Sequence, residues 1–372
     1  MPFSCLFVPR ARARLLVVSI AFLAAGQAMA AGAVSTPLPI SVDAALARAK
    51  VPREAVSVVV QETGSTTMRV DWQGSRLVNP ASVFKLVTTY VALEKLGPSW
   101  TWNTPVWLLG HVRQPGPDGV LDGDLVIKGS GDPSLVLERL WLLLRRVRQL
   151  GVREIRGDIV LDRSAFSVPD ATPADFDNEP LRPYNVGADA LLLNQKSMLL
   201  RFTPDVSAGV ARIASDLPLA GVRIDAEVPL SSAPCADWRG ALRPEFGDPL
   251  RIRFTGSYAV GCGEKVWPLA YADPARFNAR ALEGLWREAG GTLTGRVRDG
   301  AAPANLQPSF EVNSPPLIDV IRDINKYSNN TMAQQVFLTL ALTEKGPGTP
   351  QAARDVLGQW LLTRLGEVAI GT

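Results

Sequence analysis

The sequence predicts a mixed α/β protein in which helical segments flank a long, mostly β middle region. Apolar residues recur at helical spacing after Asn79-Pro80 and again from Pro315 onwards. Between these segments, residues 198–258 alternate between apolar and polar side chains and are interrupted by prolines, as short strands and turns are. A chain of 372 residues is long enough for two domains, or for one domain that carries a large insertion.

The first 30 residues have the organisation of a secretory signal. Arginines at positions 10, 12 and 14 precede the apolar run 15–25, and Ala28-Met29-Ala30 has the small residues of a cleavage site. The apolar run is too short for a comfortable membrane span. We therefore expect cleavage after Ala30 and a soluble, exported, periplasmic protein that begins at Ala31.

The charge of the exported chain argues against some classes of partner. The whole chain has a net charge of +3, and residues 1–30 hold three arginines and no acidic residue, which leaves 3 − 3 = 0. A neutral chain without a block of like charge does not favour nucleic acid or anionic lipid as a partner.

Two cysteines remain after export, because Cys5 leaves with the signal. Cys235 and Cys262 flank strand-like runs, and a single disulfide is the simplest state for such a pair in an oxidising compartment. Two buried free thiols are the alternative. Their surroundings contain no metal-ligand spacing, so we expect no metal and no cofactor.

The first candidate site is Ser82-Val83-Phe84-Lys85. Asn79 suits a helix N-cap and Pro80 a first helical residue, and the helical pattern then runs to Gly97-Pro98. This places Ser82 in the first turn and Lys85 one turn further along the same face.

A serine and a lysine in this arrangement fit a nucleophile and its base. A hydroxyl is a weak nucleophile until a neighbouring group takes its proton, and a neutral lysine can do so. Burial and the positive end of the helix dipole both lower the pKa of Lys85 in this reading. The alternative is that Ser82 only helps to cap the helix and that Lys85 is a solvated charge.

The rest of the chain continues the pattern of helices and strands in order. We expect strands at 106–112, 119–128 and 156–162, helices at 135–150 and 274–289, and a small β domain between 198 and 258. Helices follow at 317–324 and 332–342, joined by the polar turn 326–330.

That polar turn is the second candidate site. Ser328 could relay a proton to a leaving amine, and Asn330 could orient a peptide group of a substrate by hydrogen bonds. The residues alone favour ordinary capping, in which Asn330 starts the helix at Thr331 and Ser328 closes the preceding turn.

Other nucleophile schemes have weaker support in this sequence. The one histidine, His111, lies in an expected strand, and no Gly-x-Ser-x-Gly segment occurs in the chain. The segment Gly129-Ser130-Gly131-Asp132 lacks the lysine of a phosphate-binding loop.

Together, Ser82-Val83-Phe84-Lys85 and Ser328-Asn329-Asn330 resemble the signature of the penicillin-recognising serine enzymes. Over about residues 40–365 the chain more closely resembles the D-alanyl-D-alanine carboxypeptidase/endopeptidase family, the class C low-molecular-mass penicillin-binding proteins. Further motifs carry this resemblance in the expected order: Asn79-Pro80-Ala81-Ser82, Gly131-Asp132-Pro133-Ser134-Leu135, Gly157-Asp158-Ile159, Pro183-Tyr184-Asn185 and 325–330.

The resemblance implies a split, β-lactamase-like transpeptidase domain with a large, mostly β insertion. Its parts would be residues 31–100 and 268–372 for the transpeptidase-like domain and 101–267 for the insertion. It also implies that Ser82 is acylated, that Lys85 is its base, and that Ser328 and Asn330 relay a proton and hold the substrate. Peptidoglycan stem peptides would be substrates and β-lactam antibiotics covalent inhibitors; the oligomeric state stays open.

One motif of this family is missing from the sequence. The family carries Lys-Thr-Gly on a strand well after the second motif, and none of the 372 − 330 = 42 residues after Asn330 spell it. We expect a chain truncated at its C-terminal end. Little or no activity is expected, because the strand that would bind the substrate carboxylate and supply one oxyanion donor is missing. An inactive peptidoglycan- or partner-binding remnant, or a product that folds poorly, are the alternatives.

Overall fold

The computed structural model describes residues 37–116, 118–169 and 172–366. The expected signal segment, Cys5 and the cleavage site after Ala30 lie outside these residues. The chain divides into two compact units, residues 1–79 and 80–372, and each is described by itself. Within the described ranges, no helix has both the length and the hydrophobicity that a membrane span requires.

The described residues of the first unit form an α-helix, a short 3-10 turn and a hairpin. Helix α1 (Ile40–Arg48) precedes the antiparallel pair β1 (Val58–Gln61) and β2 (Met68–Trp72). Gly64 lies in the connecting turn with a φ of 81°, a left-handed value that glycine adopts without steric cost. The guanidinium of Arg53 stacks over the ring of Trp72, 4.8 Å from its centroid.

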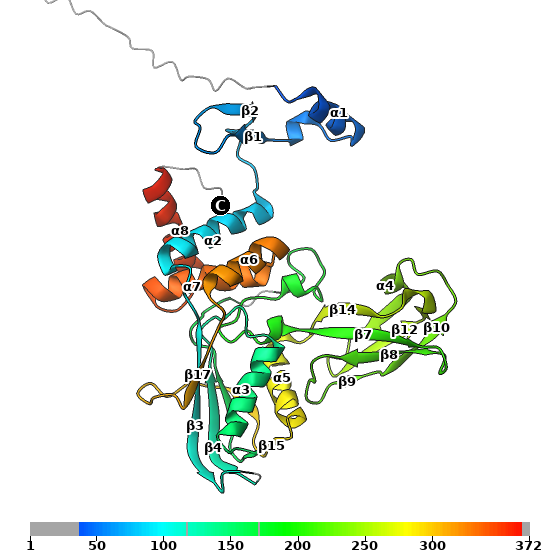
Figure 1. The fold of residues 1–372 in the computed structure, drawn as a ribbon, viewed down its shortest axis with the longest axis vertical. Coiled ribbons are helices and arrows are strands. Elements are labelled where there is room, and N and C mark those ends of the chain that lie inside the picture. The colour runs from blue at the N-terminus through cyan, green and yellow to red at the C-terminus, as the bar shows by residue number, and fades with distance from the viewer. Residues whose placement is uncertain (1–36, 117, 170–171, 367–372) are drawn as a thin grey trace, which may run out of the picture. The chain divides into compact units, whose positions relative to one another are not determined.

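Four helices of the second unit pack around one apolar core (Figure 1). They are α2 (Phe84–Leu96), α6 (Leu317–Tyr327), α7 (Asn330–Lys345) and α8 (Pro350–Leu365). Helix α6 shows why: Leu317, Val320, Ile321 and Ile324 recur at helical spacing and are all buried. The expected helices at 317–324 and 332–342 are therefore confirmed, with α7 longer at both ends.

A seven-stranded mixed sheet is formed by strands that lie between α2 and α6 in the chain. Its strands are β3 (Asn103–Arg113), β4 (Val120–Lys128), β5 (Glu154–Ile155), β6 (Ile159–Asp162), β15 (Thr292–Leu293), β16 (Val297–Asp299) and β17 (Phe310–Asn313). The long antiparallel pair β3–β4 is its centre, and β5 and β6 both run parallel to β4.

Two amphipathic helices contribute to the core of this sheet. Helix α3 (Leu137–Gln149) buries Leu140, Leu143, Leu144 and Val147, and α5 (Pro274–Glu288) lies beside α3 in Figure 1. Both helices match the segments that the sequence predicts, because their apolar residues recur every three to four positions.

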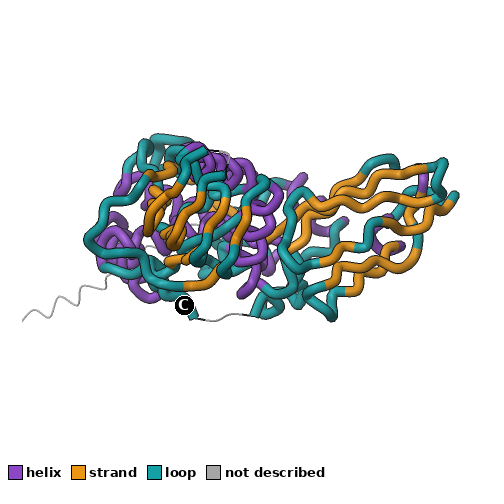
Figure 2. The backbone as a smooth tube through the Cα atoms, turned by 90° about the horizontal axis from the view of Figure 1, so that it is seen from below, coloured by secondary structure: helices purple, strands orange, loops and turns teal. Residues whose placement is uncertain are grey.

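The remaining strands form the β region that Figure 2 shows as a separate group of strands. One sheet has the order β13-β10-β8-β7-β14, and a smaller one the order β11-β12-β9. Their bounds are β7 (Ser197–Asp205), β8 (Val210–Ser215), β9 (Arg223–Ile224), β10 (Glu227–Ser231), β11 (Leu242–Glu245), β12 (Arg251–Gly256), β13 (Tyr258–Ala259) and β14 (Lys265–Ala270), with the short helix α4 (Trp238–Ala241) before β11.

Strands from both sides of residue 267, the expected end of the insertion, belong to the seven-stranded sheet. β15, β16 and β17 pair with β5, β6 and β3. The sheet that begins with β3 therefore continues to Asn313. Strands of two to four residues carry too little periodicity to be assigned to a sheet from sequence, so only the fold shows this pairing.

Cys235 and Cys262 are joined by a disulfide across 27 positions of the chain. This is the pairing that the sequence suggests for an exported protein. The bond closes a loop that contains α4, β11, β12 and β13. It joins the segments that follow β10 and β13, two neighbouring strands of the five-stranded sheet.

Replacing both cysteines by serine is expected to lower the free energy of unfolding by roughly 3 to 4 kcal/mol, because the unfolded chain regains the entropy of an open loop. Urea denaturation followed by circular dichroism measures this change. A reductant should lower the stability of the parent chain and leave the double variant unaffected. Equal midpoints for the oxidised parent and the variant would contradict the prediction.

Candidate active site

The segment that carries Ser82 differs in one respect from the sequence expectation. Residues Ala81–Val83 form a single 3-10 turn, and α2 begins only at Phe84. Ala81 has a φ of 47°, whereas an α-helix requires a φ near −63°. The helix therefore cannot start at Pro80, as the sequence suggests, although Ser82 and Lys85 are still one turn apart.

Lys85 connects the two candidate motifs. Its Nζ donates a hydrogen bond to the Oγ of Ser82 at 2.9 Å and another to the Oγ of Ser328 at 3.3 Å. Lys85 and Ser328 are 243 positions apart in the chain. The packing of α6 and α7 against α2 brings these three side chains together.

The environment of Lys85 shifts its protonation equilibrium towards the neutral form. Partial burial lowers the pKa of Lys85 below its ordinary value, because burial removes the water that solvates an ammonium group. A lysine with a lowered pKa is a better base near neutral pH than a solvated one. Both serine hydroxyls stay exposed, so a substrate could reach them.

Ser328 is held by the backbone between two helices. It is the residue that ends α6, with φ 52° and ψ 40°, a left-handed conformation that is uncommon outside glycine. The N–H of the next residue donates to the carbonyl of Ile324 at 3.1 Å, which completes the helix end. Ser328 thus closes the preceding turn, as expected, and its hydroxyl also faces Lys85.

The cap of α7 is Asn329 and not Asn330, which corrects the sequence expectation. The side chain of Asn329 accepts from the N–H of Met332 at 3.0 Å, while Asn330 is the first residue of the helix. The amide of Asn330 is therefore not used as a cap. Its Nδ2 makes a long contact of 3.5 Å with the carbonyl of Tyr184, at the edge of hydrogen-bonding distance.

A residue that the sequence does not single out holds this turn. The Oε1 of Gln195 accepts from the Nδ2 of Asn329 at 3.2 Å. Gln195 is the middle of three successive residues with positive φ, namely Asn194, Gln195 and Lys196 at 43°, 50° and 46°. Of the three, only Asn194 is a residue type that favours this conformation, so the sequence does not predict a run of three left-handed residues.

A buried ion cluster anchors the same loop to α7. The carboxylate of Asp189, 1% exposed, binds Arg163 at 2.6 Å and Lys196 at 2.7 Å. The side chain of Gln335, on α7, accepts from the N–H of Asp189 at 3.0 Å and donates to its carbonyl at 2.8 Å. The loop from Asp189 to Lys196, which contacts Asn329 through Gln195, is therefore held at both ends.

Comparison with known proteins agrees with these features. The sequence profile of the D-Ala-D-Ala carboxypeptidase 3 (S13) family matches residues 38–369. The chain is 27% identical over 333 residues to a D-alanyl-D-alanine carboxypeptidase of Actinomadura sp., a match that covers 86% of this chain and 60% of the relative. It is 23% identical over 295 residues to the D-alanyl-D-alanine carboxypeptidase DacB of Haemophilus influenzae, covering 77% and 59%. The chain thus spans about three fifths of the length of these two relatives.

Solved structures show the same fold. The crystal structure of penicillin binding protein 4 (dacB) from Haemophilus influenzae superposes with a TM-score of 0.67 at 22% identity, covering 85% of this chain and 69% of that one. A second structure of that protein, complexed with a novel β-lactam, gives a TM-score of 0.59 at 22% identity over 83% and 66%. Because the family profile extends over nearly all the described residues, the chain belongs to the D-Ala-D-Ala carboxypeptidase 3 (S13) family.

Proposed function

We propose that this chain is a serine-type D-alanyl-D-alanine carboxypeptidase/endopeptidase that acts on peptidoglycan stem peptides. The contact of Lys85 with both Ser82 and Ser328 is the observation that carries the proposal. Family membership and the names of the two relatives support the substrate class. The signal-like leader supports export to the periplasm, where this substrate is found.

In the first half of the proposed reaction, Ser82 forms an ester with the substrate. Its Oγ attacks the carbonyl carbon of the penultimate D-alanine while its proton passes to the neutral Nζ of Lys85. The backbone N–H of Ser82 donates to the oxyanion of the tetrahedral intermediate. The C–N bond then breaks, and the leaving amine receives its proton from Lys85 through the hydroxyl of Ser328.

In the second half, water hydrolyses the ester. Lys85, neutral again, takes a proton from the attacking water, and Ser82 recovers its proton when the ester bond breaks. The amide of Asn330 is positioned on the first turn of α7 to hold a peptide group of the substrate. The products are D-alanine, or a second peptide in the endopeptidase reaction, and a stem peptide with a new carboxylate.

A fluorescent penicillin tests this proposal, because its strained amide mimics the D-alanyl-D-alanine bond and acylates the same serine. We expect peptide mapping to place the label on Ser82, and Ser82→Ala to remove it. Labelling should be far stronger when the chain is continued through a family segment that carries Lys-Thr-Gly, since an oxyanion donor is worth about 10²- to 10³-fold.

The control is Ser207→Ala, which removes an exposed hydroxyl on the loop after β7 and should leave the labelling unchanged. Label on a serine other than Ser82 would refute the assignment of the nucleophile. No label on either length of chain would favour a non-catalytic binding protein of the same family.

A further inference from the structure

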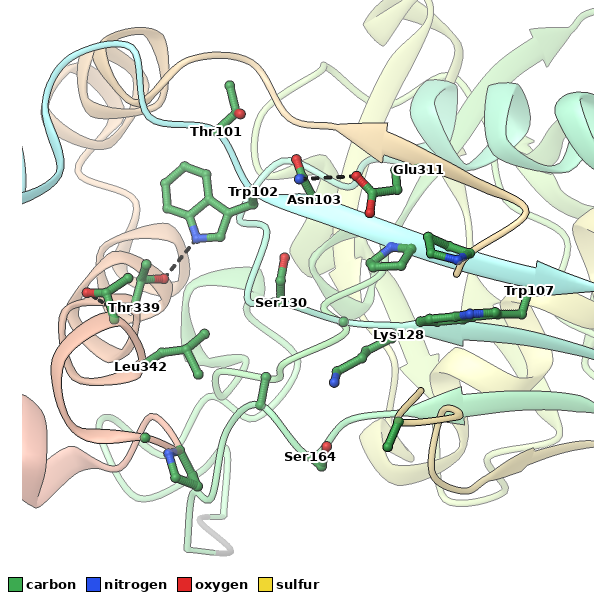
Figure 3. Close-up of a pocket in the computed structure, with 18 of the residues that line it drawn as sticks. Thr101, Trp102, Asn103, Trp107, Lys128, Ser130, Ser164, Glu311, Thr339 and Leu342 are labelled. Atoms are coloured by element: carbon green, nitrogen blue, oxygen red, sulfur yellow. Dashed lines mark hydrogen bonds between the residues drawn. The ribbon is translucent and has the colours of Figure 1, made fainter. Parts of the chain in front are cut away.

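A cavity of about 770 Å³ lies within the second unit, and none of Ser82, Lys85 and Ser328 lines it. Figure 3 shows it where the beginning of β3 and the end of β4 meet the C-terminal part of α7. Its volume is within the range of about 300 to 1,000 Å³ that small-molecule sites occupy. The proposed reaction makes no use of it.

A positive charge projects into this cavity. Lys128 is the last residue of β4, and in Figure 3 its ammonium group lies in the middle of the lining side chains. Asp162, opposite Lys128 in the β4–β6 ladder, attracts it, but its carboxylate accepts the N–H groups of Ser164 and Ala302, each at 2.8 Å. Among the described residues, no hydrogen bond or ion pair within contact distance holds the Lys128 ammonium.

Two further polar atoms of the cavity wall lack partners. The Oγ of Ser130 and the Nε1 of Trp100 are both buried and make no hydrogen bond to any described residue. Such groups are uncommon in folded proteins, because leaving a buried polar group without a partner lowers the stability by about 1 to 3 kcal/mol. Both atoms are closed to solvent, so the polar groups that an occupant of the cavity can contact are those of Lys128 and Glu311.

The other walls are rigid and mostly apolar. The indole N–H of Trp102 donates to the Oγ1 of Thr339 at 2.9 Å, and that of Trp107 donates to the carbonyl of Leu306 at 2.8 Å, so both rings are fixed. Near the beginning of β3, the carboxylate of Glu311 accepts from the Nδ2 of Asn103 at 3.3 Å and lines the same cavity. The cavity therefore offers one cation, one anion and apolar surface between them.

We propose that this cavity binds a short peptide with a free amine and a free carboxylate. The carboxylate contacts the ammonium of Lys128, and the amine contacts the carboxylate of Glu311. Small apolar side chains of the peptide pack against Trp102 and Trp107. A neutral oligosaccharide would supply acceptors but would bring no opposite charge to either Lys128 or Glu311.

Isothermal titration of trialanine into the Ser82→Ala chain tests the proposal, since this variant excludes any covalent reaction at Ser82. We expect saturable binding in the millimolar range or tighter. Trialanine amide, which lacks the carboxylate, should bind about 10-fold more weakly or worse, as the loss of one charge-assisted hydrogen bond predicts. Equal affinities for the acid and the amide, or no binding of the acid, would overturn the proposal.

Variants locate the binding site. Lys128→Met, made in the Ser82→Ala chain, should lower the affinity for trialanine by the same factor of about 10. It should leave the weaker affinity for trialanine amide unchanged. The matched control is Lys265→Met, on β14 outside the cavity, which should have no effect on either probe. Thermal unfolding shows that each variant is folded.

A labelling experiment separates this proposal from the proposed function. With Ser82 present, Lys128→Met should be labelled by fluorescent penicillin as strongly as the parent, because Lys128 is not part of the serine site. An equal loss of trialanine binding in Lys265→Met, or tighter binding of chitobiose than of trialanine, would overturn the peptide assignment.

Discussion

Replacing Lys85 by alanine is expected to slow the acylation of Ser82 by about 10²- to 10⁴-fold, the usual effect of losing a general base. The physical reason is that Lys85 is the amine that contacts the Ser82 hydroxyl, at 2.9 Å, and the serine has no other described basic partner there. The measurement is the second-order rate of labelling by a fluorescent penicillin.

The pH dependence of the same rate identifies the base. Lys85 can accept a proton only when it is neutral, so the rate should fall as the pH falls through the pKa of Lys85. Burial lowers that pKa, so the midpoint should lie below the usual lysine value of about 10.4. Lys85→Ala should lack this titration.

Lys95→Ala is the matched control, because Lys95 lies at the other end of α2 and pairs with Glu344 at 2.6 Å. It should keep both the parent rate and the parent pH profile. A Lys85→Ala chain that labels at the parent rate would contradict the role of Lys85 as base.

Replacing Asp189 by alanine is expected to lower the free energy of unfolding by about 3 to 5 kcal/mol. The change leaves Lys196, 9% exposed on its side chain, without its counter-charge, and Arg163 loses the same partner. Urea denaturation measures the loss. Because the Asp189 loop also contacts α7, acylation of Ser82 should slow as well in the folded fraction.

Two further variants distinguish a buried-charge effect from a general loss of stability. Adding Lys196→Met to Asp189→Ala should recover part of the stability, since it removes one of the unpaired charges. Glu264→Ala removes an exposed partner of Arg201 and should cost less than about 1 kcal/mol. A cost for Asp189→Ala as small as that of Glu264→Ala would contradict the prediction.

The helices of this protein were the most predictable part of its fold. Each of α3, α5 and α6 has apolar residues at helical spacing that end up on one buried face, so local sequence is sufficient to assign them. The start of α2 was not predictable, because Asn79-Pro80 is a good helix start by itself and the left-handed Ala81 that prevents it has no local signal.

The candidate site was predictable in its chemistry and only partly in its geometry. Ser82 and Lys85 lie one turn apart, so the sequence is enough to expect their contact. The contact of Lys85 with Ser328 depends on how α2 and α6 pack, and the residues of the second turn taken alone favoured ordinary capping. Gln195 had no signal at all, because its role comes from a left-handed turn that lies next to Asn329 only in the fold.

By itself, the sequence determined the mixed α/β class, the helices and the two motifs, because these depend on residues that are close together in the chain. The tertiary structure decided that β15–β17 pair with the seven-stranded sheet and that Asn329 caps α7. It brought Ser328 into contact with Lys85. It also created the cavity around Lys128, lined by segments from residue 100 to residue 347. These features depend on contacts between distant segments, and a linear pattern of side chains contains no information about which distant segments meet.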